Sequence, residues 1–147
     1  MAPPVHPVDV FLILHDGSSL LLALRQNTGY DDGLWNLPSG KLEHGEDAVS
    51  AVLREAWEEI GVRLSSVRPV VTVHHRVSPA QARVGLVFAA PFDPGSHGAP
   101  VNAEPHKCGG IGWFPAATLP PNMSGYSADC VQAYLDGASF LLSGWAS

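Results

Sequence analysis

Three glutamates, Glu55, Glu58 and Glu59, stand close together in a stretch with the composition of a helix. Because each helical residue advances by about 100°, their carboxylates fall within one arc of about 100°. At about 6 Å and an effective dielectric of about 20, each pair would repel by about 3 kcal/mol before solvent screening. A divalent cation would reverse the sign of this interaction, and hard oxygen ligands favour Mg²⁺, Mn²⁺ or Ca²⁺. The spacing therefore indicates a site for a metal ion and phosphate oxygens.

The alternative for such a helix is a solvated acidic face, in which lysine or arginine usually alternates with the acids. Here Glu55 has glutamates at both i+3 and i+4, and only Arg54 offsets them. The helical wheel places the apolar side chains opposite the acids, so we expect one face to be core and the other carboxylate. Ala48 and Ala51 are expected to keep the acidic face low enough for a polyphosphate to approach. The expected core residues are Val49, Leu53, Ala56, Trp57 and Ile60.

The stretch from Gly40 to Val62, GKLEHGEDAVSAVLREAWEEIGV, resembles the signature box of the Nudix hydrolases of the MutT type. No fixed position of the box is missing. The matching residues are Gly40, Glu46, Arg54, Glu55, Ala56, Glu58, Glu59, Gly61 and Val62. The neighbouring segments LWNLPSG and EPHKCGGIGWFP are also similar to family segments. The resemblance implies a single domain over residues 1–147 with the α/β Nudix fold, a mixed β-sheet sandwiched between helices (α/β/α).

The resemblance also implies a metal site. Glu55, Glu58 and Glu59 would bind Mg²⁺, with Mn²⁺ as the other candidate, together with the main-chain carbonyl of Ser39. Many family members have glycine at the position of Ser39, and serine suffices if only its carbonyl is used. A carboxylate would take the proton from water, with Glu58 and Glu55 ranked above Glu104 and the choice left open.

Two further box residues have competing interpretations. Arg54 would orient a catalytic carboxylate, as its counterpart does in similar proteins, or it would form a surface pair with Glu58 worth well under 1 kcal/mol. We favour the first role. Glu46 suits the start of the helix, where an acid complements the helix dipole, better than it suits metal binding.

Outside the box, Arg25 and Asn122 are the candidate substrate-binding residues. Arg25 stands at the end of an apolar strand pattern and would contact a phosphate, or it would simply be a solubilising surface charge. Similar MutT-type enzymes use an asparagine in the region of Asn122 to read a purine edge, although asparagine is also a common turn residue. Aromatic side chains that could stack on a base are more often core residues. They are Tyr30, Trp35, Trp113 and Tyr126.

The reaction implied by the box is the Mg²⁺-dependent hydrolysis of a nucleoside triphosphate or another nucleoside diphosphate derivative. The products would be a nucleoside monophosphate and pyrophosphate or a second phosphorylated fragment. One alternative is the hydrolysis of a sugar nucleotide, a dinucleoside polyphosphate or capped RNA. Another is a non-catalytic nucleotide-sensing module, and a third is a purely structural domain. The sequence leaves open the base, the sugar, the leaving group, the number of metal ions and the oligomeric state.

Composition favours one compact domain. Hydrophobic residues make up 46% of the 147 residues, charged residues make up 15%, and the net charge is -6. This charge argues against non-specific binding to nucleic acid. The start MAPPVHP is unlike a secretory signal, and the apolar runs are too short to cross a bilayer, so we expect a cytoplasmic protein. We therefore expect the two cysteines, Cys108 and Cys130, to stay reduced.

Apolar patterns predict strands at 8–16, 19–26, 68–77, 82–92 and 110–114. The box helix is expected from about Glu46 to Gly61, and a second helix from about Ser127 to Leu135. Residues 91–100, rich in proline and glycine, are predicted to form a loop.

Overall fold

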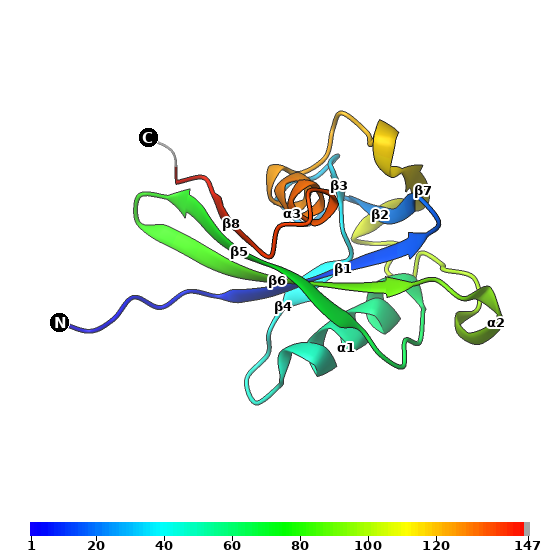
Figure 1. Ribbon diagram of the computed structural model, residues 1–147, viewed down its shortest axis with the longest axis horizontal. Helices are drawn as coiled ribbons and strands as arrows, with labels where there is room; N and C mark the ends of the chain where they lie inside the picture. Colours follow the sequence, from blue (N-terminus) through cyan, green and yellow to red (C-terminus); the bar gives the residue numbers. More distant parts are fainter. Residues whose placement is uncertain (146–147) are drawn as a thin grey trace.

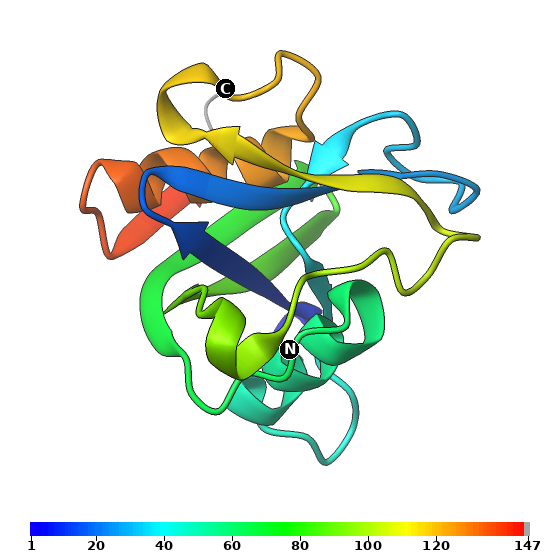
Figure 2. The same cartoon turned by 90° about the vertical axis from the view of Figure 1, so that its right-hand side faces the viewer.

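Strand β1 (Val8–Asp16) is an almost unbroken apolar run, and it lies at the centre of the sheet. The computed structural model describes residues 1–145 and places the sheet between helices α1 (Ala48–Ile60) and α3 (Gly125–Leu135) (Figure 1). Viewed after a quarter turn, the two helices lie on opposite sides of the strands (Figure 2). This is the α/β/α arrangement expected from the sequence.

The sheet is mixed, with the strand order β3-β2-β1-β6-β5-β8, while β4 pairs with β1 and β7 pairs with β2. The β1–β6 and β5–β8 pairs are parallel and the other pairs are antiparallel. The remaining bounds are β2 (Ser19–Arg25), β3 (Trp35–Asn36), β4 (Ser39–Lys41), β5 (Arg68–Ser78), β6 (Gln81–Pro91), β7 (Cys108–Pro115) and β8 (Phe140–Ser143). Short helices occupy Pro94–His97 (α2) and Ala116–Thr118 (η1).

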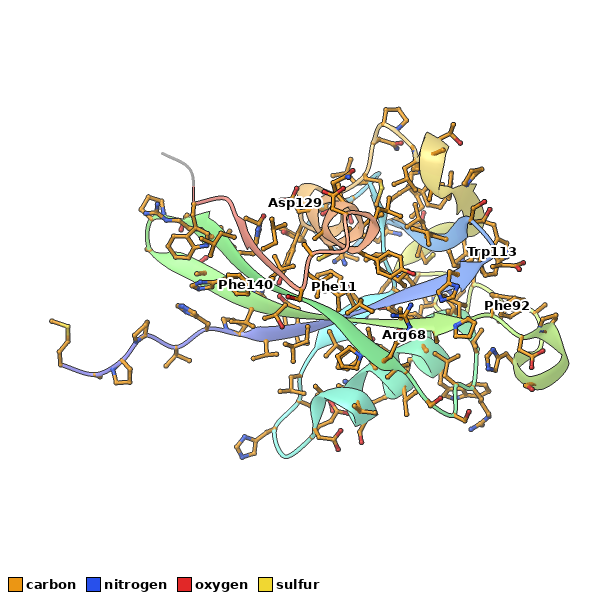
Figure 3. The ribbon with its side chains drawn as sticks, viewed as in Figure 1. Phe11, Arg68, Phe92, Trp113, Asp129 and Phe140 are labelled. Carbon is orange, nitrogen blue, oxygen red and sulfur yellow. The ribbon has the colours of Figure 1, made fainter. Side chains whose placement is uncertain are left out.

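Alternate residues of β1 supply two hydrophobic cores, because successive strand side chains point to opposite faces. Val10, Leu12 and Leu14 pack toward α1, whereas Phe11 and Ile13 pack toward α3. Phe11 meets the ring of Tyr126 on α3 edge to face at 4.7 Å, and side chains fill both layers (Figure 3). The central strand is therefore fixed on both faces, which gives the site a rigid floor.

Strands β1 and β2 separate soon after their turn. They are paired only at His15–Leu20 and Asp16–Ser19, and the free edge of β1 then pairs with β4 from Asp9 to Phe11. This separation leaves room for β4, which contains Ser39 and Gly40, beside β1. The start of the signature box is thereby held by main-chain hydrogen bonds within the sheet.

Helix α1 begins after Asp47, whose carboxylate accepts hydrogen bonds from the main-chain N–H and hydroxyl of Ser50, both at 2.8 Å. It ends at Gly61, which has φ 65°, the left-handed conformation that glycine adopts without strain. The sequence predicted this end correctly, and the start falls two residues after the predicted one.

The predicted orientation of α1 was wrong for part of the helix. Ala51 and Val52 are buried, whereas Val49 and Trp57 are exposed. The guanidinium of Arg63 stacks over the Trp57 ring at 3.8 Å, which explains how an exposed tryptophan is accommodated. The buried arc of the helix runs from Ala51 through Val52 and Ala56 to Ile60. With 100° per residue, this arc includes the directions of Glu55 and Glu59. The arc packs against β1 and β4, so these two acids lie on the same side of the helix as its core residues.

The other predicted elements are confirmed with small differences in length, and some elements were missed. Helix α3 begins at Gly125 rather than Ser127, and α2 lies within the predicted loop 91–100. The short strand β8 and the separate strand β4 were not predicted. Cys108 and Cys130 are buried free thiols. Within residues 1–145, every helix is too short or too polar to span a membrane.

Candidate active site

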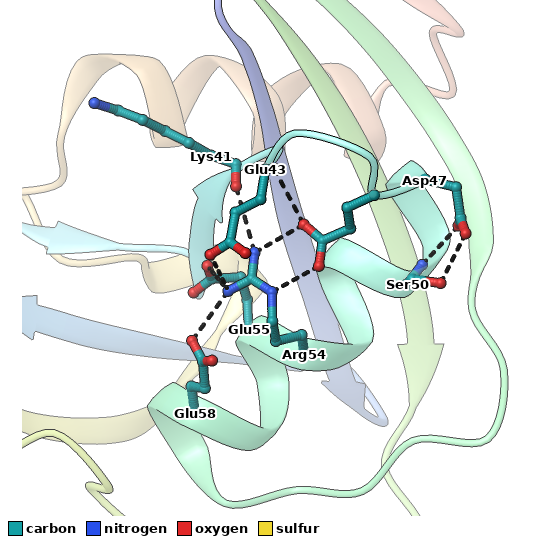
Figure 4. Close-up of polar contacts among 8 residues, drawn as sticks. Lys41, Glu43, Asp47, Ser50, Arg54, Glu55 and Glu58 are labelled. Carbon is teal, nitrogen blue, oxygen red and sulfur yellow. Dashed lines mark hydrogen bonds and ion pairs between the residues drawn. The ribbon is translucent and has the colours of Figure 1, made fainter.

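Arg54 is the centre of an ion-pair cluster on α1 (Figure 4). Its Nε and Nη2 donate to the two carboxylate oxygens of Glu46 at 2.7 and 3.0 Å. Its Nη1 donates to Glu55 Oε1 at 2.8 Å and to Glu58 Oε2 at 3.0 Å, and lies 3.6 Å from Glu43. The pair with Glu58 expected from the sequence is therefore present, but it is one of several. Arg54 ties two of the clustered acids to Glu46, which anchors the guanidinium.

Glu46 and the start of the box form the support for Arg54. Glu46 Oε1 also accepts the main-chain N–H of Glu43 at 3.2 Å, and Arg54 Nη2 reaches the carbonyl of Lys41 at 3.4 Å. The hydrogen bond from Arg54 is the main reason why the pKa of Glu46 is lowered. Glu46 thus has contacts that fit the structural role expected from the sequence, but these are made with Arg54, whereas Asp47 caps the start of the helix.

The loop of β4 contacts the acids of α1 directly. The main-chain N–H of Ser39 donates to Glu59 Oε2 at 3.1 Å. Gly40 lies against Glu55 so closely that a Cβ at position 40 would collide with the side chain of Glu55. Glycine in this first box position therefore leaves room for the Glu55 side chain against the backbone of β4.

Replacing Gly40 by alanine is expected to displace Glu55, break its contact with Arg54 and lower activity by about a hundredfold. Gly110→Ala is the matched control, since a Cβ there meets no atom within 4 Å. Steady-state kinetics and thermal unfolding of both variants check this prediction. Equal activities of Gly40→Ala and the parent would contradict it.

Burial dominates the electrostatics of Glu55 and Glu59. It raises the pKa of Glu55, with the charges of Glu58 and Glu104 in support and Arg54 in opposition. It raises the pKa of Glu59 well above the ordinary value, Glu55 raises it further, and the Ser39 N–H opposes the change. Glu55 and Glu59 are thus neighbouring, half-buried acids, and the positive charge around them is too small to keep the pKa of either at its ordinary value.

Glu104 comes from a distant loop that is attached to the end of α1. The main-chain N–H groups of Val101 and Ala103 donate to the carbonyls of Ile60 and Glu59 at 2.9 and 3.1 Å. These bonds bring Glu104 into the same cleft as Glu55 and Glu59, near enough for its charge to raise the pKa of both. The sequence had given Glu104 a role only by resemblance.

A cleft of about 1010 Å³ opens in front of the cluster and extends across β1 toward α3. Ser39, Arg54, Glu55, Glu58, Glu59 and Glu104 line it, and Arg25 does so farther along. Arg25 Nε donates to the carbonyl of Tyr30 at 2.9 Å. Asn122 is exposed and is not among the lining residues; its amide donates to the carbonyl of Gly33 at 3.1 Å. The structure thus brings together all of the predicted site residues except Asn122.

The family model for the NUDIX domain matches residues 5–134 of the chain. The chain belongs to the Nudix hydrolase family. A crystal structure of a MutT Nudix hydrolase from Burkholderia pseudomallei superposes with a TM-score of 0.77 at 25% identity, covering 88% of this chain and 98% of that one. The Nudix fold expected from the sequence is confirmed.

Curated relatives match parts of the chain at moderate identity. A MutT-like protein of Streptomyces ambofaciens is 41% identical over 63 residues, which is 43% of this chain and 39% of that protein. An NAD-capped RNA hydrolase, NudC, of Chromobacterium violaceum is 27% identical over 118 residues, which is 80% of this chain and 41% of that protein. The chain thus spans about two fifths of the length of these two relatives.

Carboxylate and carbonyl oxygens of the Nudix box are suitable ligands for a hard cation. Within residues 1–145, however, no three His, Cys, Asp or Glu side chains are placed to hold an ion by themselves. The crowded acids with raised pKa values fit a cation that takes its remaining ligands from phosphate oxygens and water, as Mg²⁺ typically does.

The far part of the Nudix cleft contains polar residues that the sequence did not single out. Asp9, Asp31, Asn36 and Arg83 line it, together with Tyr30 and Tyr126. Trp35 and Trp113 instead pack against the two hydrophobic cores, as is usual for aromatics. Asp9 and Arg83 stand in ordinary strand patterns, so only the strand pairing reveals their proximity.

Proposed function

We propose that the protein hydrolyses a phosphoanhydride bond of a nucleoside triphosphate or another nucleoside diphosphate derivative with Mg²⁺ as cofactor. The products are a nucleoside monophosphate and pyrophosphate, or a second phosphorylated fragment. The observation that carries this proposal is the cluster of Glu55, Glu58 and Glu59 at one end of a cleft of about 1010 Å³. A cleft of this size admits a whole nucleotide beside the acids.

Glu55, Glu58 and Glu59, with the carbonyl of Ser39, are the residues that would hold Mg²⁺, and Mn²⁺ suits the same oxygens. When bound, such an ion neutralises phosphate charge and acidifies water. Arg54 holds Glu55 and Glu58 in place through Nη1. Its hydrogen bond to Glu46 fixes the position of the guanidinium itself. A carboxylate of the set accepts the proton of the attacking water, with Glu58 and Glu55 favoured over Glu104.

The cleft also suits larger nucleotides. A solved structure at 17% identity is described as a UDP-X diphosphatase, and NudC acts on NAD-capped RNA. The eight Lys and Arg residues and the net charge of -6 disfavour a long RNA, whereas a sugar nucleotide or a dinucleoside polyphosphate meets no such barrier. A nucleotide-sensing module would bind the same ligands without turnover.

The test is incubation with Mg²⁺ and a panel of nucleoside triphosphates, sugar nucleotides and dinucleoside polyphosphates, followed by product identification. The double variant Glu58→Gln with Glu59→Gln serves as the control for contaminating activity. Monophosphate with pyrophosphate would place the attack at the α or β phosphorus and exclude loss of orthophosphate. The proposal fails if the parent cleaves nothing faster than the control, and tight binding without turnover would identify a sensor.

Magnesium is also expected to raise the melting temperature of the protein, because a ligand that binds only the folded state stabilises that state by mass action. At a concentration of 100 times the Kd, the gain is about 2.7 kcal/mol. Thermal unfolding with increasing MgCl₂, against NaCl of equal ionic strength, measures it. A purely structural domain predicts equal melting temperatures in the two salts.

A further inference from the structure

The far part of the cleft contains a partly buried ion pair between Asp9 and Arg83. Arg83 donates from Nε and Nη2 to the two oxygens of Asp9 at 2.8 and 2.7 Å. Asp9 is 7% exposed, and its Oδ2 also accepts the hydroxyl of Tyr126 at 3.0 Å. All three side chains lie on the face of the sheet that α3 covers. Asp9 therefore fixes both the guanidinium and the phenol.

Tyr126 reaches Asp9 because the strand beneath it carries no side chain at the crossing point. Gly85 is the partner of Asp9 in the β1–β6 register, and a Cβ at position 85 would lie 2.6 Å from the Tyr126 hydroxyl. On the outer side, the ring of His75 stacks on Tyr126 at 4.1 Å. These contacts hold the ion pair in one geometry.

Arg83 keeps unused donors. A guanidinium carries five N–H groups, and only Nε and Nη2 are engaged with Asp9. Within residues 1–145, Nη1 makes no hydrogen bond. It is also absent from the buried polar atoms that lack a partner, so solvent or a ligand can reach it. Because Arg83 lines the cleft, these N–H groups are available to a ligand there.

The charge of this pair decides what kind of acceptor it suits. Asp9 largely offsets the charge of Arg83, so the free N–H groups offer directed hydrogen bonds with little net positive potential. Asp31, which also lines the cleft, adds further negative charge. A neutral carbonyl oxygen is favoured over a phosphate in such surroundings. Tyr30, 55% exposed in the same cleft, offers a ring face to a flat ligand.

The pair is also separated from the reacting end of the cleft. Glu59 of the cluster accepts the main-chain N–H of Ser39 on β4, whereas Arg83 is on β6, and β1 lies between these strands. Two strand spacings amount to about 10 Å. A ligand group at Arg83 is therefore a part of the substrate remote from the phosphoanhydride.

We propose that Arg83 is a specificity-determining residue that reads the carbonyl oxygen of a 6-oxopurine base, with Asp9 and Tyr126 as positioning residues. The proposal rests on the function proposed above. In protein–DNA complexes, arginine donates to O6 and N7 of guanine, whereas adenine presents an N6 donor in place of the O6 acceptor. The protein is thus expected to prefer guanine or hypoxanthine nucleotides to adenine nucleotides.

The test measures binding rather than turnover, so that failure of the hydrolase assignment does not affect it. The probes are the non-hydrolysable α,β-methylene analogues of GTP, ITP and ATP, titrated into the protein with Mg²⁺ in a calorimeter. The parent is expected to bind the GTP and ITP analogues about tenfold more tightly than the ATP analogue. The base preference should disappear in the double variant Asp9→Asn with Arg83→Gln, which leaves no lone buried charge.

Two further variants separate positioning from folding. Tyr126→Phe removes only the hydroxyl that contacts Asp9, and it should reduce the base preference without abolishing it. Arg68→Gln, an exposed arginine on β5, is the control for lost positive charge and should keep the preference. Thermal unfolding confirms that each variant is folded.

Each contrary result has a definite meaning. Equal binding of the three analogues by the parent, or no binding of any, overturns the proposal. An ITP analogue that behaves like the ATP analogue assigns recognition to the guanine amine and not to Arg83. A double variant that weakens all three equally shows a contact with phosphate or a structural role, which also overturns it.

Discussion

Glu58→Gln is expected to lower kcat by about a thousandfold while leaving the fold intact. Glu58 is proposed both as a metal ligand and as one of the two preferred bases, and a bound divalent ion contributes several kcal/mol to such a reaction. The side chain is 47% exposed and touches the rest of the cluster through Arg54 Nη1 at 3.0 Å. Its replacement by an amide of the same shape therefore removes a ligand without removing packing.

Glu43→Gln is the matched control for this experiment. Glu43 is 66% exposed and lies 3.6 Å from the same Nη1 atom, so its replacement changes the charge beside Arg54 by the same amount. Its activity should stay within about threefold of the parent, since an exposed pair contributes little. Single-turnover kinetics and thermal unfolding compare the two. Similar losses in both variants would show that charge near Arg54 matters, and that Glu58 has no special role.

The sequence was sufficient to predict the acids of the cluster because their identities and spacing carry the chemistry. It could not predict the side of α1 on which they lie. A repeat of about 100° places Glu55 and Glu59 beside the small residues Ala51 and Ala56, and only the packing of α1 on β1 and β4 shows that this side is buried. Small side chains there let the sheet approach, and Gly40 allows the contact with Glu55.

The far part of the cleft was out of reach for a different reason. Asp9 and Arg83 are 74 residues apart, and they meet because β1 and β6 pair in parallel. A parallel pair requires a long crossover, whose register no local pattern fixes. Asn122 shows the reverse case, since the resemblance to MutT-type enzymes suggested base recognition there. In the structure, the side-chain amide of Asn122 donates a hydrogen bond to the carbonyl of Gly33 and so fixes the loop before β3.

Glu59→Gln is expected to make the metal-free protein more resistant to alkaline pH. Burial raises the pKa of Glu59 in the folded state well above its value in the unfolded chain. Its contribution to the free energy of unfolding is therefore fully present below the unfolded pKa, and is lost as pH rises through the folded pKa. Above the unfolded pKa, that loss reaches up to about 1.4 kcal/mol per pH unit.

Glutamine at position 59 does not titrate, so the free energy of unfolding of the parent should fall relative to the variant as pH rises from the unfolded pKa of Glu59 to its raised folded pKa. Urea denaturation in EDTA at several pH values measures this difference, and groups shared by both proteins cancel. A constant difference across the range would contradict the prediction. With saturating Mg²⁺ the order should reverse, because the parent then binds the ion through all of its acids and the variant through fewer. The proposed cation site thus destabilises the metal-free fold, since the burial that raises the pKa of Glu59 makes its charged form unfavourable until a cation binds.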